Sequence, residues 1–265
     1  MAAPTTLALR HDGAVLHVTL NRPEVRNAMS LAMVRELIEV VKTAEQDGET
    51  RVVVLRGAGG HFCAGADLKD MAAARARLAE DPDAVMKVNA AFGELCIAYA
   101  GASLAVIAVL EGTVMGGGFG LACVTDVAIA AGNTVFRLPE TSLGVLPAQI
   151  APFLVERLGY AEAKRLAVTG SRIGAEEALR IRLVHEVHAA DALEAALARL
   201  TGDILHCAPG ALAATKALVS RARWEQPAAL VNDAAQAFSR AALGPEGVEG
   251  MTAFLQKRKA KWTPQ

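Results

Sequence analysis

Two loops of small residues carry the first chemical signal in this chain. Residues 62–68 (FCAGADL) follow the apolar run 52–55, and residues 115–120 (MGGGFG) follow the apolar run 104–110. Each loop joins a strand-like run to an expected helix start, where the first backbone N–H groups have no partner inside the helix. Taken singly, each loop could be an ordinary turn, with Asp67 as a helix cap. Two such N–H groups converging on one oxygen would stabilise an enolate or a tetrahedral alkoxide, which predicts an enzyme acting on a carbonyl compound.

Glu140 is the acid/base candidate. It directly follows Pro139, after an expected short strand at residues 134–137. In an apolar pocket, desolvation would raise the pKa of this carboxyl group and let it return a proton. The alternative is a carboxylate at the start of a helix, because Pro139 suits a first helical turn. The residues alone leave both roles open.

Length and composition fit a globular protein with a sizeable core. The chain has 265 residues, of which 53% are hydrophobic and 4% aromatic, with a mean hydropathy of +0.30. That supports a sizeable core, in one large domain or in a core domain with an appendage. A net charge of −1 creates no overall field for nucleic acid or an anionic membrane, so neither is an expected partner. No secretory signal and no apolar stretch near the roughly 18 residues of a membrane helix is found, which favours a cytoplasmic protein.

The cysteines and histidines do not suggest a metal site. His185 and His188 are three positions apart, with no nearby carboxylate or thiol expected to complete a set of ligands. No dinucleotide fingerprint is present either, so neither a metal nor a redox cofactor is expected. The cysteines lack C-x-x-C spacing and are expected to be buried free thiols in a reducing compartment. They are Cys63, Cys96, Cys123 and Cys207.

Alternating strand and helix signals predict an α/β architecture followed by helices. A hairpin with an Asp-Gly turn is expected at the start, and Ser30 is expected to cap the next helix. The segment 71–83 is interpreted as a mobile segment or broken helix. The remaining expected strands are 51–56, 104–110 and 126–131, and the late helices are 191–206, 210–223 and 246–261.

Taken together and in order, these motifs resemble the crotonase superfamily, also called the enoyl-CoA hydratase/isomerase superfamily. The resemblance runs along nearly the whole chain. Its motifs are residues 20–23 (LNRP), 27–28 (NA), 61–68 (HFCAGADL), 116–118 (GGG), 123–126 (CVTD), 138–140 (LPE), 143–147 (LGVLP), 183–187 (LVHEV) and 254–259 (FLQKRK).

The resemblance implies an α/β, ClpP-like crotonase fold. It would comprise a spiral of ββα units over residues 1–195 and a helical C-terminal trimerisation region over residues 196–265. Members form homotrimers or dimers of trimers, and their substrate is an acyl-CoA thioester, so no separate cofactor is implied. The apolar residues expected at subunit contacts are Trp224, Phe238, Phe254 and Trp262.

The resemblance also assigns roles to individual residues. The backbone N–H groups of Ala66 and Gly117 would hold the thioester oxygen, and Glu140 would transfer the proton. Two of the residues implied for coenzyme A, Phe254 and Lys257, would come from the C-terminal helix of a neighbouring subunit; Phe254 could equally be a packing residue. The others are Val25, Arg26, Ala64, Asp67 and Leu68.

One position departs from the family pattern. Two-glutamate hydratases carry a second catalytic glutamate three residues after the middle glycine of the GGG loop, where this chain has Gly120. A hydratase in which Glu140 both activates water and returns the proton is the leading hypothesis. An enoyl-CoA isomerase that shuttles one proton is the first alternative. A crotonase-fold protein that binds coenzyme A without turnover is the second.

Two stretches indicate a branch within the superfamily. Residues 117–121 and 143–152 are similar to those of bacterial methylglutaconyl-CoA and isohexenylglutaconyl-CoA hydratases, most of all the latter. Those enzymes act in leucine and acyclic-terpene catabolism on branched glutaconyl thioesters. Such a substrate has a distal carboxylate, and Arg137, Gln149 or another arginine could receive it.

Overall fold

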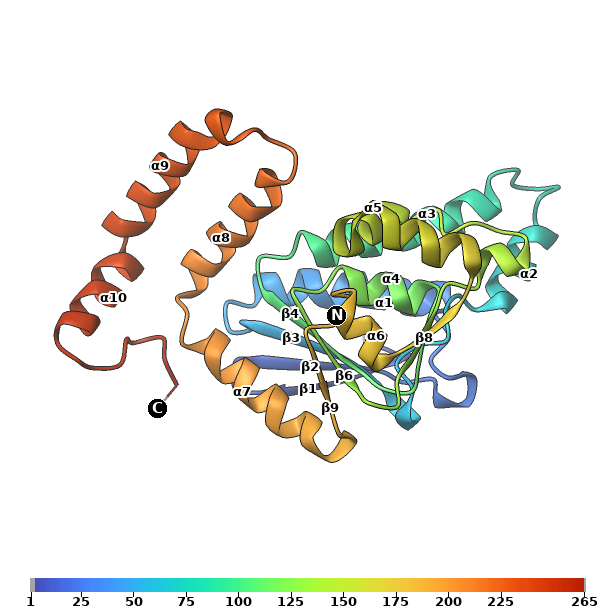
Figure 1. Ribbon diagram of the computed structural model, residues 1–265, viewed down its shortest axis with the longest axis horizontal. Coiled ribbons are helices and arrows are strands. Elements are labelled where there is room, and N and C mark those ends of the chain that lie inside the picture. The colour runs from blue at the N-terminus through green and yellow to red at the C-terminus, as the bar shows by residue number, and fades with distance from the viewer. Residues whose placement is uncertain (1–2, 265) are drawn as a thin grey trace.

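A six-stranded, mostly parallel sheet forms the centre of the protein, whose computed structural model describes residues 3–264 (Figure 1). The first two strands form an antiparallel hairpin, and every later pair of neighbours is parallel. Strands that alternate with helices in this way confirm the predicted α/β class. In sheet order the strands are β1 (Leu7–Asp12), β2 (Val15–Leu20), β3 (Val52–Gly57), β4 (Ala105–Leu110), β6 (Val127–Ala131) and β9 (Glu186–His188).

Ten α-helices are found in the described residues. Ser30 caps α1 as predicted, because its Oγ accepts a hydrogen bond from Met33 N at 3.2 Å. The helices are α1 (Leu31–Gln46), α2 (Leu68–Ala76), α3 (Ala84–Ala100), α4 (Gly117–Cys123), α5 (Ala151–Thr169), α6 (Ala175–Arg180), α7 (Leu193–Leu205), α8 (Pro209–Ala222), α9 (Pro227–Leu243) and α10 (Pro245–Leu255).

Both faces of the large sheet are covered by helices. Val53 and Val106 belong to the apolar cluster that includes α1, α3 and α4, whereas Val54 and Ile107 belong to the cluster that includes α7. Successive strand residues face opposite sides, so both sets of valines and isoleucines are buried. This explains why the strands read as continuous apolar runs.

A second sheet of three short strands sets the geometry of the loops. Its order is β5 (Thr113–Met115), β7 (Val135–Arg137) and β8 (Arg172–Gly174). Strands β5 and β7 are parallel, and Met115 pairs with Arg137. Parallel strands end at the same edge of a sheet, so the glycine loop after β5 and the segment leading to Glu140 leave it together.

Several sequence expectations need correction. The register pairs Asp12 with Val15, so the first hairpin turns at Gly13 and Ala14 rather than at Asp-Gly. Two three-residue strands, β8 and β9, occur after residue 151, where helices were expected to dominate. The segment 71–83, by contrast, contains the end of α2 and the turn before α3, which agrees with the broken helix that was one of its two expected forms. Cys207 is exposed, while the other three cysteines are buried as predicted.

The C-terminal helix is shorter than predicted. Helix α10 ends at Leu255, and Lys257 has a φ of +52°, which an α-helix does not accommodate. The basic residues therefore lie beyond the helix rather than on it. Trp262 is half-buried, and its Nε1 donates to His206 O at 3.0 Å, so part of the side chain also holds the C-terminal segment within its own chain.

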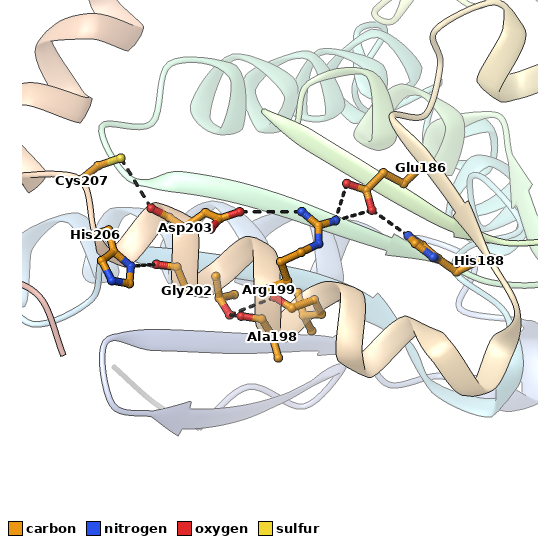
Figure 2. A network of polar contacts seen from close by, with 10 residues as sticks. Glu186, His188, Ala198, Arg199, Gly202, Asp203, His206 and Cys207 are labelled. Atoms are coloured by element: carbon orange, nitrogen blue, oxygen red, sulfur yellow. Dashed lines mark hydrogen bonds and ion pairs between the residues drawn. The ribbon is translucent and has the colours of Figure 1, made fainter. Parts of the chain in front are cut away.

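Helix α7 is tied to the edge of the large sheet by a chain of polar contacts. Figure 2 shows Arg199 of α7 reaching Glu186 of β9 at 2.6 Å, with His188 Nε2 at 2.7 Å from the same carboxylate. The hydrogen bond from Arg199 lowers the pKa of Glu186, and the contact with His188 lowers it further. Partial burial has the opposite effect but does not outweigh them. His188 thus does have a carboxylate partner, and it is part of an ion-pair network that fixes α7. The expected domain division between residues 195 and 196 falls within this helix.

Helices α8, α9 and α10 extend away from the sheet and its covering helices (Figure 1). Across residues 3–264, no helix has the length and apolar character needed to cross a membrane. The same residues contain no group of three or more His, Cys, Asp or Glu side chains arranged to hold a metal ion.

Candidate active site

The two small-residue loops lie directly against each other. Cys63 pairs with β5, since its N–H donates to Thr113 O at 3.0 Å and its carbonyl accepts from Met115 N at 2.9 Å. Gly65 then passes so close to the second loop that an added Cβ would lie 3.3 Å from Met115 O and 3.7 Å from Gly116 Cα. Its φ of +102° is a second reason why glycine is needed. Backbone pairing therefore holds the loops together.

Ala66 and Gly117 each present a backbone N–H that has no acceptor in the part of the chain that the structure describes. Ala66 forms a parallel bridge with Met29. The N–H of Met29 donates to Gly65 O at 2.8 Å, and the carbonyl of Met29 accepts from Asp67 N at 2.9 Å. In such a bridge, the residue between the two bonds points its own N–H away from the partner. Gly117 is the first residue of α4, so no helix carbonyl accepts its N–H. Two free N–H groups on touching loops can form an oxyanion hole.

The Glu140 carboxyl group lies beside the second loop. A Cβ added to Gly116 would lie 3.1 Å from Glu140 Oε1. Oε2 is buried and has no hydrogen-bond partner among the described residues. Burial raises the pKa of Glu140 above its usual value, against the opposite effect of its own backbone N–H. Glu140 does begin the short 3₁₀ helix Glu140–Leu143, but buried carboxylates are normally paired. An unpartnered oxygen here is suited to proton transfer.

The small sheet positions this carboxyl group. Gly116 N donates to Arg137 O at 3.1 Å, which continues the pairing of β5 with β7. The Arg137 side chain extends toward the end of α5, where its Nε donates to Gly170 O at 2.9 Å. The segment that carries Glu140 is thus fixed at both the glycine loop and α5. This use of Arg137 gives it a structural role.

Comparison with known proteins identifies the family. A family model described as enoyl-CoA hydratase/isomerase matches residues 10–265. The chain belongs to the enoyl-CoA hydratase/isomerase family. 2,3-Dehydroadipyl-CoA hydratase of Escherichia coli K12 is 32% identical over 254 residues, covering 95% of this chain and 96% of that protein. Carnitinyl-CoA dehydratase of Proteus mirabilis is 33% identical over 263 residues, covering 97% and 98%.

Solved structures confirm the expected crotonase fold. AtuE of Pseudomonas aeruginosa superposes with a TM-score of 0.95 at 53% identity, covering 98% of this chain and all (100%) of that one. An enoyl-CoA hydratase/isomerase from Marinobacter aquaeolei superposes with a TM-score of 0.94 at 50% identity, covering 98% and 99%. Members of the enoyl-CoA hydratase/isomerase family thus share the whole architecture, including the C-terminal helices.

Gly120 occupies the position where two-glutamate hydratases of the family carry their second glutamate, and neighbouring side chains fill the space around it. A Cβ on Gly120 would lie 2.2 Å from Ile150 Cγ2 and 3.5 Å from Phe92 Cε1. The ring of Phe92 also lies 3.3 Å from where a Cβ on Gly117 would be. Phe92 and Ile150 therefore line the site. Phe92 gave no sequence signal, and Ile150 was noted only as part of the stretch 143–152, with no role of its own. Two predicted carboxylates lie at these loops. Asp67 is engaged by Lys69 N and Arg22, whereas Glu140 keeps a buried oxygen that has no hydrogen-bond partner among the described residues.

Val25 and Arg26 lie next to the first loop. Arg26 O accepts a hydrogen bond from Ala64 N at 2.9 Å, so these three predicted coenzyme A contacts are neighbours. Asn27 holds the turn in place from a fully buried position, with Nδ2 donating to Ala58 O at 2.9 Å and to His61 O at 2.7 Å. Arg26 and Asn27 both have positive φ, which Asn tolerates better than most residues. In the sequence Asn27 stands out only as part of the motif 27–28, and its structural role comes from these contacts.

Asp67 and Leu68 begin α2 on the other side of Ala66. Asp67 caps that helix, because Oδ1 accepts from Lys69 N at 2.9 Å, while Oδ2 pairs with Arg22 at 2.8 Å. Partial burial opposes ionisation, but these two contacts outweigh it and lower the pKa of Asp67. Asp67 thus has the capping role that was one of its two expected roles. Leu68 is 69% exposed and adds apolar surface next to the loop.

Phe254 and Lys257 are not brought to the loops of their own chain. Helix α10 and helix α2, which starts two residues after Ala66, lie at opposite ends of the protein (Figure 1). Phe254 is 84% exposed, and Lys257 is exposed as well. Any contact of these two residues with bound coenzyme A would have to be made across a subunit boundary.

Proposed function

We propose that this protein is an enoyl-CoA hydratase that adds water to a branched, glutaconyl-type α,β-unsaturated acyl-CoA thioester. The observation that carries the proposal is the Glu140 carboxyl group. One of its oxygens lies beside the glycine loop, 3.1 Å from where a Cβ on Gly116 would be, and the other is buried with no hydrogen-bond partner among the described residues. A base with a raised pKa beside a free N–H pair suits chemistry at the α and β carbons of a thioester.

The reaction begins with the thioester oxygen bound by the N–H groups of Ala66 and Gly117. Glu140 takes a proton from water as the water oxygen forms a bond to Cβ. The π electrons of the double bond move toward the thioester carbonyl, and the resulting enolate oxygen is stabilised by the two donors. Glu140 then gives the same proton to Cα as the enolate collapses. The water proton ends on Cα, the hydroxyl group ends on Cβ, and the carboxylate is regenerated.

Coenzyme A would bind along the first loop. Val25, Arg26 and Ala64 form one neighbouring group, and Asp67 and Leu68 begin the next helix. Phe254 and Lys257 of a neighbouring subunit would close the nucleotide end, with the ammonium group pairing with a phosphate. The proposal includes no metal and no redox cofactor.

The branched glutaconyl class is supported by the residues around Glu140. The stretches 117–121 and 143–152 resemble those of methylglutaconyl-CoA and isohexenylglutaconyl-CoA hydratases. The segment just after Glu140 also exposes apolar side chains that an acyl branch could contact: Leu143 at 61%, Val145 at 53% and Leu146 at 70%.

Two other functions remain as alternatives. Because Ile150 fills the space at Gly120, only one carboxylate serves the proposed site, and one carboxylate suffices to move a proton between Cα and Cγ in an isomerase. A non-catalytic protein that only binds coenzyme A is the other alternative. It does not account for the unpartnered buried oxygen of Glu140.

A homotrimer or a dimer of trimers is proposed as the assembly. The region after α7 carries large exposed apolar side chains, which a monomer would leave in water. They include Trp224 at 78%, Phe238 at 75%, Leu243 at 80% and Phe254 at 84%. In this organisation residues 1–195 are the catalytic core and residues 196–265 supply subunit contacts.

Turnover of a panel of enoyl-CoA esters tests the proposal. The panel contains crotonyl-CoA, 3-methylcrotonyl-CoA and 3-methylglutaconyl-CoA, and the absorbance of the conjugated thioester is followed with product mass. A product heavier by one water supports a hydratase. Unchanged mass with a moved double bond identifies an isomerase, and tight ester binding without any product identifies the non-catalytic alternative.

A further inference from the structure

We propose that Asn89, held in place by Gln149, is a specificity-determining residue that binds the terminal carboxylate of the acyl chain. The proposal rests on the proposed function, and it names the side chain that would recognise the terminal carboxylate of the proposed substrate. Both residues lie outside the proton-transfer machinery, and the pair is formed by two elements that meet at the site.

Helix α3 brings Asn89 to the wall of the site. Phe92 lies one turn further along this helix, and its ring lies 3.3 Å from where a Cβ on Gly117 would be. Residues three apart share a face of a helix, so Asn89 lies on the face that reaches the oxyanion loop. Asn89 is half-buried, so part of the residue remains accessible.

Gln149 reaches Asn89 from the segment before α5. Its Nε2 donates to Asn89 Oδ1 at 2.8 Å. The Gln149 side chain crosses α3 at Gly93, where an added Cβ would lie only 2.3 Å from Oε1. The next residue, Ile150, fills the space at Gly120. The segment before α5 therefore places Ile150 where a second catalytic carboxylate would lie, and it places the amide of Gln149 next to it, against α3.

The pair keeps hydrogen-bonding capacity for a ligand. Its single internal bond uses Asn89 Oδ1 and one N–H of Gln149. The Asn89 amide N–H groups have no recorded acceptor within residues 3–264, and Gln149 orients them. An amide N–H donates to a carboxylate, and the amide does not ionise at neutral pH, so the role is binding rather than acid–base transfer.

The other predicted receptor for this carboxylate is engaged elsewhere. Arg137 donates from Nε to Gly170 O at 2.9 Å and from Nη2 to Ser142 Oγ at 3.3 Å. A neutral donor pair beside Phe92 and Ile150 would discriminate an acyl chain ending in a carboxylate from one ending in a methyl group. Rejection follows because a substrate without the carboxylate leaves these donors unpaired.

Asn89→Asp is the decisive variant, because it keeps the shape and replaces the donor with a negative charge. For 3-methylglutaconyl-CoA we expect KM to rise roughly ten- to hundredfold, the range of a hydrogen bond to a charged group, with kcat little changed. For 3-methylcrotonyl-CoA, which lacks the terminal carboxylate, KM should stay within about twofold of the wild-type value. Gln149→Met should give a smaller rise in KM, again for the carboxylated ester alone. Glu94→Gln, on the exposed side of the same helix, is the control and should change neither ester.

Equal losses for both esters would overturn the proposal, since they would indicate a role in folding or in holding water. Unchanged kinetics for both would overturn it as well. If the wild-type protein hydrates neither ester, the proposed function fails, and calorimetry with the saturated esters glutaryl-CoA and butyryl-CoA tests the amide pair separately. A wild-type preference for glutaryl-CoA that is lost in Asn89→Asp supports the assignment, and the absence of any preference rejects it.

Discussion

Ile150 occupies the space that a side chain at Gly120 would need. An added Cβ would lie 2.2 Å from Ile150 Cγ2, well inside van der Waals contact, and Ile150 is only 3% exposed. Helix α4 and the segment before α5 are therefore packed directly on each other at this point. A second glutamate cannot be accommodated here unless Ile150 gives way, so a single carboxylate has to take up and return the proton in the proposed reaction.

Gly120→Ala should destabilise the protein through this contact. Overpacking a filled core typically costs about 1–3 kcal/mol, and the backbone must shift because the clashing atom is close to the main chain. The free energy of unfolding from urea titration is the measurement. Gly132→Ala is the matched control, since its added Cβ would meet only His188 O at 3.8 Å. Ile150→Ala in the Gly120→Ala background should recover part of the loss. An additive loss in the double variant would contradict the packing argument.

Ionisation of Glu140 should make the folded protein less stable near neutral pH. Burial raises its pKa above the usual value of 4.5, so the fold favours the protonated form. This contribution is fully present below the pKa of the unfolded chain and is lost as pH rises through the raised pKa. Glu140→Gln removes the charge, so near neutral pH it should be more stable by about 1 kcal/mol, or roughly 2–4 °C in Tm. Below about pH 4 the two proteins should melt together. A constant difference across the pH range would argue against a raised pKa.

The regular parts of the fold follow from sequence because burial on both faces leaves long apolar runs. Strands β3, β4 and β6 each begin one residue after the predicted start. Strands β8 and β9 have three residues each, too few for a periodic signal, and their pairing partners lie far along the chain. The end of α10 depends on the φ of +52° at Lys257, which no residue type in that basic run indicates.

The candidate site also contains residues that the sequence predicts and residues that only tertiary contacts reveal. Glycine-rich loops can be recognised from the sequence, because few other residues permit two backbones to approach as closely as those of Gly65 and Gly116 do. Glu140 was found by its place after Pro139. The roles of Asn89 and Ile150 in the site were not predicted, because a polar residue in a helix and an apolar residue before one are both ordinary in sequence. Their significance comes from tertiary contacts with Gln149 and Gly120.

Lys257→Glu should weaken binding of coenzyme A esters if the nucleotide site is shared between subunits. Loss of one charge-assisted contact to a phosphate and the new repulsion should raise Kd roughly tenfold or more, and more strongly at low salt. Calorimetry with a saturated acyl-CoA measures this, and light scattering should show an unchanged oligomer. Lys42→Glu, an equal charge change on the exposed side of α1, is the control. A monomer at working concentration would refute the shared site.

Catalysis should not depend on a metal ion. The proposed mechanism uses two backbone donors and one carboxylate, and no step is assigned to a metal. Turnover of the enoyl-CoA panel should therefore be unchanged after extended dialysis against a chelator. The control is a chelated sample with magnesium or zinc added back. Activity that disappears on chelation and returns with one of these ions would overturn this part of the proposal.

Glu140→Gln should abolish most of the turnover while leaving binding nearly intact. The amide keeps the shape of the carboxyl group but can no longer accept the proton of water, so kcat should fall by roughly 10²–10⁴-fold. Ester affinity should change little, because the N–H groups of Ala66 and Gly117 remain in place. In deuterated water, the same change should abolish deuterium incorporation at Cα, since one carboxyl group delivers that proton. Glu39→Gln, exposed on α1, should leave all three measurements at wild-type values.

The pH profile provides an independent check on the same residue. The base must be ionised in the free enzyme, so kcat/KM of the wild-type protein should fall as pH drops through a pKa above 4.5. The residual activity of Glu140→Gln should not show that acidic limb, because the titrating group is gone. Near-normal turnover in a correctly folded Glu140→Gln protein, or a retained acidic limb, would point to a second base that the loops do not contain. The single-carboxylate mechanism stands only if the acidic limb and the deuterium exchange disappear together.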